Sequence, residues 1–217
     1  HDQSSAASDV YKRQELLLVV LMQRRLNELE GLCLNWLSDE ENTDEGIARL
    51  LRANDGDFLP SDAARVAVSR RFHQAIAVFE FALRTGDETH VDSALELLDA
   101  CVEAADRMRH VPLWWSSILA RHLIDDLWDR SLHNRLPIVP DDGSRWQELR
   151  SNFIELATQR DIAEIDLWPS QIAAATRVVD ETDSLVVALP TSSGKTRIAE
   201  LCILRCLAGG RRVVYVT

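Results

Sequence analysis

The chain has 217 residues, of which 46% are hydrophobic and 27% are charged, and its formal net charge is −11. This composition is typical of a globular protein of one or two domains. No apolar run approaches the roughly 18 residues that a membrane span needs, and the polar first residues lack the pattern of a secretion signal. We therefore expect a cytoplasmic protein with no membrane partner, in which the four cysteines, none in Cys-x-x-Cys spacing, are reduced packing residues.

The negative charge is concentrated in the N-terminal part of the chain. From Trp168 to the end, six basic residues face four acidic ones, a balance of +2, so residues 1–167 carry −13. An acidic region is a poor candidate for contacts with phosphate backbones. The mildly basic C-terminal part permits such contacts.

Residues 1–14 are polar and aperiodic and resemble translated adapter sequence, so we expect a disordered or artefactual tail. Residues 15–160 show helical periodicity and are predicted to form a helical accessory domain. Binding of a protein partner is one function to consider for this domain. Within it, two amphipathic runs flank Thr85-Gly86-Asp87, the first starting after a candidate N-cap at Ser61. This pattern predicts an antiparallel helical hairpin.

After residue 160 the pattern changes. Ser184–Leu189 is a short apolar run with β-branched residues, Thr196–Ala208 is helical and ends at Gly209-Gly210, and Val213–Val216 is a second apolar run. A strand, a loop, a helix and a strand within about thirty residues predict a βαβ unit with buried parallel strands.

The loop between the first strand and the helix, Leu189-Pro-Thr-Ser-Ser-Gly-Lys-Thr196, has the composition of a phosphate-binding P-loop. Small residues allow backbone N–H groups to close around phosphates at the positive end of a helix dipole. Lys195 can reach the β- and γ-phosphates, and the Thr196 hydroxyl can bind Mg²⁺. Leu189 stands where the general pattern has its first glycine, which disfavours a kinase or a small GTPase more than a helicase.

The segments Leu167-Trp-Pro-Ser-Gln171, Leu189–Glu200 and Val213–Thr217 together resemble superfamily 2 helicases of the DEAD/DEAH-box kind, in particular the Ski2-like group. Leu189–Thr196 is similar to their motif I. Gln171 lies 24 residues before Lys195 and is similar to the Q-motif glutamine, which in the family reads the adenine edge.

The resemblance implies a fold and a set of site residues. The fold is a mainly α N-terminal region followed, over residues 161–217, by the start of an incomplete α/β RecA-like P-loop domain. ATP and Mg²⁺ are the implied cofactors and DNA or RNA the implied partner. The implied ATP-binding residues are Gln171, Thr191, Ser192, Ser193, Gly194, Lys195 and Thr196, with Lys195 and Thr196 also serving catalysis, Thr196 the metal, and Thr217 the nucleic acid.

The predicted function is the ATP-binding portion of an ATP-dependent helicase or translocase, as an N-terminal fragment that ends near motif Ia. The Mg²⁺-binding acids and arginine finger of the family do not appear after the P-loop, so we expect negligible ATP hydrolysis by this chain alone. Two alternatives stay open. One is another P-loop ATPase, such as a restriction or defence translocase, and the other is a helical protein-interaction module with an incomplete ATPase.

Overall fold

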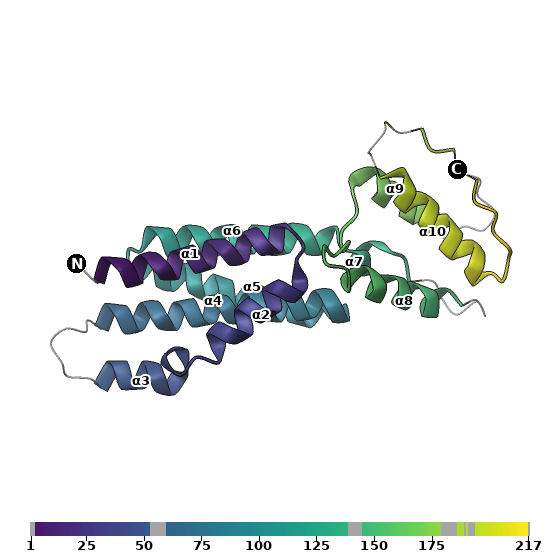
Figure 1. Ribbon diagram of the computed structural model, residues 1–217. Helices are drawn as coiled ribbons and strands as arrows, with labels where there is room; N and C mark the ends of the chain where they lie inside the picture. The colour runs from purple at the N-terminus through teal and green to yellow at the C-terminus, as the bar shows by residue number, and fades with distance from the viewer. Residues whose placement is uncertain are drawn as a thin grey trace. The chain divides into compact units, whose positions relative to one another are not determined.

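The computed structural model describes residues 3–52, 60–138, 145–178, 186–188, 190 and 194–216 (Figure 1). Its regular elements are helices: α1 Gln3–Met22, α2 Leu26–Leu37, the 3₁₀ turn η1 Glu40–Asn42, α3 Asp44–Arg52, α4 Pro60–Thr85, α5 Glu88–Arg107, α6 Val111–Asp129, α7 Leu132–Arg135, α8 Trp146–Thr158, α9 Pro169–Val178 and α10 Lys195–Ala208. The chain divides into an N-terminal unit, residues 1–126 and 161–163, and a C-terminal unit, residues 127–160 and 164–217.

The predicted start of an α/β RecA-like domain is wrong, because the described residues are all-helical and contain no strand. Their one β-type contact is an isolated bridge between Ser131 and Asp166. A β-strand is defined by ladder hydrogen bonds to a neighbouring strand, and residues 186–188 and 211–216 have none. The apolar composition suggested buried strands, but Val186, Val214 and Val216 are 97%, 87% and 84% exposed. Residues 184, 185 and 189 of the first predicted strand lie outside the described residues.

The predicted helical hairpin is confirmed in the N-terminal unit, where α4 and α5 pack along each other. Gly86 connects them with a positive φ of 77°, and the Asp87 side chain caps α5 by accepting a hydrogen bond from the Thr89 amide. The apolar faces predicted from the sequence are buried against each other, including Phe72 and Phe79. Ser61 lies inside α4 rather than before it.

A polar cluster in the N-terminal unit fixes α1 and α2 on α4. The Gln14 amide is fully buried and donates to the Ser69 hydroxyl at 3.3 Å. The His73 ring stacks on Trp36 with centroids 4.0 Å apart, and its Nδ1 lies 2.8 Å from the Ser69 carbonyl oxygen. Gln14 belongs to the segment expected to be a tail, and the structure places residues 3–14 in α1. No described helix combines the length and apolarity needed to cross a membrane.

The C-terminal unit is built from α7, α8, α9 and α10 around one apolar core (Figure 1). Trp146, at the start of α8, is almost fully buried, and its indole N–H donates to the Pro137 carbonyl at 2.9 Å. The Arg145 amide donates to the Ala208 carbonyl at 3.2 Å, which links the start of α8 to the end of α10. The core comprises Leu132, Leu136, Trp146, Ile154, Ala157, Leu167, Ala175, Leu201, Leu204 and Ala208. The helix that follows the predicted P-loop therefore packs on residues that precede it in the sequence.

Candidate functional site

The candidate site is the N-terminus of α10. Gly194 precedes the helix with φ 78° and ψ 25°, in the left-handed region, and no side chain caps this end. Lys195 and Thr196 occupy the first turn and are exposed. The first amides of an α-helix have no partner within it and carry the positive end of the helix dipole. An exposed ammonium, an exposed hydroxyl and these amides together can hold an anion that carries a metal ion.

Gln171 from α9 lies directly against Gly194. Its Nε2 donates to the Gly194 carbonyl at 3.1 Å, and its Oε1 accepts from the Trp168 amide at 2.8 Å. The Gln171 residue is only 6% exposed. A Cβ placed on Gly194 would lie 2.0 Å from Nε2. Gln171 and Gly194, which the sequence analysis selected from two separate motifs, therefore meet in the fold, although the role of Gln171 in reading adenine stays a prediction.

Gly194 is thus fixed by two donors at once. Its carbonyl accepts from the Gln171 amide and from the Arg197 backbone N–H, the latter at 3.1 Å. Its torsions belong to the region that glycine enters without steric penalty. The chain enters α10 in a defined direction because both its conformation and its carbonyl are constrained.

The segment before α9 is held by backbone hydrogen bonds. The Leu167 amide donates to the Arg130 carbonyl at 2.8 Å, and the Leu132 amide donates to the Ile165 carbonyl at 2.7 Å. Leu167 is fully buried, whereas the adjacent Trp168 is 54% exposed. Trp168 therefore presents part of its side chain to solvent close to Gln171, the residue that contacts Gly194.

Arg197 is a site residue that charge counting did not reveal. It is 8% exposed, and its guanidinium carbon lies 5.1 Å from the centroid of the Phe153 ring in α8. It forms ion pairs with Glu164 and, at 2.9 Å, with Glu200. Burial lowers the pKa of Arg197, and the nearby Glu200 carboxylate acts in the opposite direction. The sequence gives one signal for this burial: Arg197 precedes Ile198 on the face of α10 that also carries the core residue Leu201.

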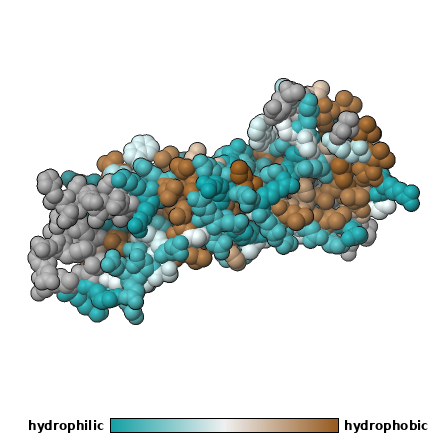
Figure 2. Space-filling view, viewed as in Figure 1, coloured by the Kyte–Doolittle hydropathy of each residue, from teal (hydrophilic) through white to brown (hydrophobic). Residues whose placement is uncertain are grey.

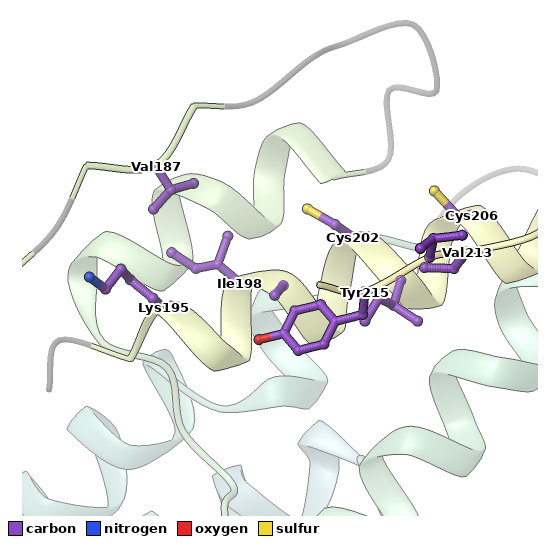
Figure 3. A pocket seen from close by; sticks show the side chains of 10 residues that line it. Val187, Lys195, Ile198, Cys202, Cys206, Val213 and Tyr215 are labelled. Atoms are coloured by element: carbon purple, nitrogen blue, oxygen red, sulfur yellow. The ribbon is translucent and has the colours of Figure 1, made fainter. Parts of the chain in front are cut away.

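An open apolar groove of about 410 Å³ follows the exposed face of α10 (Figure 3). Lys195 lies at one end and Cys206 at the other, and Val187 and Tyr215 are among its walls. Figure 2 shows apolar residues gathered on the surface of this part of the unit. Among the described residues that line the groove, Lys195 is the cationic one, and it lies at the end near Gly194.

The remaining predicted site residues lie outside the described residues. These are Thr191, Ser192 and Ser193 of the predicted P-loop, and Thr217. Their assigned contacts with phosphates and with nucleic acid therefore stay predictions. Of the predicted set, the structure describes Gln171, Gly194, Lys195 and Thr196, and all four lie at the junction of α9 and α10.

Comparisons with known proteins give partial similarities. No protein-family model matches the chain. Over 136 residues, 62% of its length, it is 24% identical to the Hachiman protein HamB of Bacillus cereus. Over 63 residues, 29% of its length, it is 44% identical to the ATP-dependent DNA helicase Hel308 of Pyrococcus abyssi. The chain spans 12% of HamB and 8% of Hel308. These matches support a general association with helicases.

Proposed function

We propose that the first turn of α10 binds the phosphates of ATP, and that this chain is the nucleotide-binding portion of an ATP-dependent nucleic-acid helicase. The observation that carries the proposal is the left-handed Gly194 that precedes exposed Lys195 and Thr196, with the buried Gln171 amide against its carbonyl. Such a helix start offers amides, a dipole and an ammonium to one anion.

Each described residue has a chemical task in this proposal. Lys195 neutralises negative charge on the terminal phosphates, and the Thr196 hydroxyl on the same turn is a ligand of the type Mg²⁺ accepts. The half-exposed Trp168 indole offers an aromatic surface for the base. Each end of the Gln171 amide makes one hydrogen bond, so a second N–H on Nε2 and a second lone pair on Oε1 remain for the adenine edge. Hydrolysis and movement on nucleic acid belong to the whole parent protein.

The similarity to Hel308 is the reason for choosing a helicase among nucleotide-binding proteins. That relative is named an ATP-dependent DNA helicase. Its identity to this chain is 44% over 63 residues, whereas the identity of HamB is 24% over 136 residues. For the parent protein we propose only the class of activity, namely ATP-dependent action on nucleic acid. DNA is the substrate that the name of Hel308 favours.

The lysine content of the chain allows a direct test. Lys12 and Lys195 are the only two lysines in the sequence. Lys12 is exposed on α1, so it serves as an internal control for reagent access. We expect Mg²⁺-ATP to slow the acylation of Lys195 by a dilute active ester, and to leave the acylation rate of Lys12 unchanged, as measured by mass spectrometry.

A binding measurement completes the test. We expect Lys195→Ala to weaken Mg²⁺-ATP binding at least about tenfold, equivalent to roughly 1.4 kcal/mol, in isothermal titration calorimetry. Lys12→Ala is the matched control and should bind as the unmodified chain does. Equal ATP affinity of the two variants, or equal protection of the two lysines, would contradict the proposed function.

A further inference from the structure

We propose that Arg197 is a positioning residue for the nucleotide site: held by Phe153 and Glu164, it fixes the first turn of α10 and thereby sets the affinity for ATP. This inference rests on the proposed function of α10. Phe153 belongs to α8, and Glu164 lies between α8 and α9. Both precede the P-loop in the sequence, so the helical segment upstream would control the phosphate site without touching the ligand.

The burial of Arg197 fixes the rotation of α10 about its axis. Successive residues of an α-helix point about 100° apart. Arg197 and Ile198 are 8% and 3% exposed, whereas Lys195 and Thr196 are exposed. Anchoring Arg197 therefore determines which way Lys195 and Thr196 face. The Arg197 amide also donates to the Gly194 carbonyl, so the anchor is connected directly to the residue that opens the helix.

The Arg197 side chain is held by contacts on several sides. The Arg197 guanidinium makes three kinds of contact: the face of the Phe153 ring at 5.1 Å, the Glu164 carboxylate, and the Glu200 carboxylate at 2.9 Å. A planar guanidinium can combine ring stacking with paired hydrogen bonds, which an ammonium does not reproduce. Glu200 is on α10 itself, so of the contacts that the Arg197 guanidinium makes, those with Phe153 and Glu164 are the ones that join α10 to other parts of the unit.

The chain provides a matched control at the other end of the same helix. Arg205 is also buried, at 6% exposed, and its guanidinium carbon lies 5.9 Å from the centroid of the Trp146 ring in α8. Replacing Arg205 removes an equivalent packing contact about 12 Å away from Arg197 along the helix axis. A loss that reflects general weakening of the unit should therefore appear equally in Arg197→Leu and Arg205→Leu.

The direction in which Glu164→Gln changes the affinity for Mg²⁺-ATP distinguishes a positioning role from a purely electrostatic one. Mg²⁺-ATP is anionic, so removing the nearby negative charge of Glu164 should tighten binding if only electrostatics act. If Glu164 holds Arg197 in place, Glu164→Gln should weaken binding instead. We expect a loss of about fivefold in affinity, equivalent to about 1 kcal/mol.

The experiment measures Mg²⁺-ATP affinity by calorimetry, and the hydrogen exchange of the α10 amides without nucleotide, on the 217-residue chain. We expect weaker binding and faster exchange in the first turn for Glu164→Gln and Arg197→Leu. Arg197→Lys should recover part of the affinity, and Arg205→Leu should bind as the unmodified chain.

Two results would overturn the inference. One is unchanged or tighter binding by Glu164→Gln, and the other is an equal loss in Arg205→Leu and Arg197→Leu. Lys195→Ala, measured in parallel, distinguishes failure of the positioning role from failure of the proposed function. If it binds weakly while the Arg197 and Glu164 variants bind normally, only the positioning role fails. If it binds ATP as tightly as the unmodified chain does, the proposed function fails, and the positioning role fails with it.

Discussion

Gly194→Ala should destabilise the C-terminal unit more than Gly210→Ala, although both glycines flank α10 and both have a positive φ. Two costs combine. An L-residue held in the left-handed region costs about 1–2 kcal/mol. The new Cβ would also lie 2.0 Å from Gln171 Nε2, so the buried amide must move and lose its bonds to Gly194 and Trp168. At about 1 kcal/mol for each hydrogen bond, the total is about 3–4 kcal/mol.

Gly210→Ala is the matched control for this prediction. Gly210 follows the other end of α10 with φ 70°, and a Cβ there would meet nothing within 4 Å. It should therefore cost only the backbone strain of about 1–2 kcal/mol. Urea unfolding followed by tryptophan fluorescence resolves the difference, since Trp146 is buried in the same unit. With an m-value near 2 kcal/mol/M, Gly194→Ala should lower the midpoint by roughly 1.5–2 M.

The contribution of Gln171 can be isolated in a double-mutant cycle. In a chain that already carries Gln171→Ala, the alanine at position 194 has no amide to displace. Gly194→Ala should then cost about as much as Gly210→Ala, that is, about 1–2 kcal/mol. The reasoning would be refuted if Gly194→Ala and Gly210→Ala cost the same in the unmodified background, or if Gln171→Ala left the cost of Gly194→Ala unchanged.

Two further predictions concern buried titratable groups. Burial lowers the pKa of His73 to about 4 from its ordinary value of 6.5, so protonation favours the unfolded state and the free energy of unfolding falls as the pH drops below 6.5. Between pH 7 and pH 5 we expect a loss of about 2 kcal/mol in urea unfolding, and His73→Phe should lack this component; equal pH profiles would contradict it. Brief alkylation of the native chain should modify Cys202 and Cys206 before Cys33 and Cys101, because the latter two are fully buried and burial raises the pKa of each thiol to about 12. Peptide mass spectrometry measures the order, and early labelling of Cys33 or Cys101 would show that their helices open.

The sequence predicts the helices well where periodicity and punctuation agree. The hairpin of α4 and α5 follows from apolar residues at helical spacing and from Gly86, which allows the positive φ of the turn. These are local properties, because each residue's preference is expressed within its own helix. The motifs select both Gln171 and Gly194 as candidate site residues, but the hydrogen bond between them, across 23 positions, is a finding of the structure.

The failures have a different physical origin. Apolar β-branched residues favour strands only where neighbouring strands satisfy their backbone hydrogen bonds, and Val213–Val216 has no such ladder in the described residues. Arg197 was counted as a charge, and its burial depends on Phe153 and Glu164, which are 44 and 33 positions earlier in the sequence. Composition and periodicity do not encode such tertiary contacts.

The net charge counted over the C-terminal part of the chain therefore overstates the positive charge that reaches its surface. The C-terminal part of the chain gains its +2 balance partly from Arg197 and Arg205, and both guanidinium groups lie over aromatic rings of α8 in the interior. On α10 this leaves Lys195 as the exposed cation. An anion at this helix start would meet one ammonium and a set of backbone amides, so its affinity must depend on the direction in which α10 presents them. Contacts with Gln171, and with Phe153 and Glu164 through Arg197, set that direction, so residues far upstream of Gly194 in the sequence influence the candidate site.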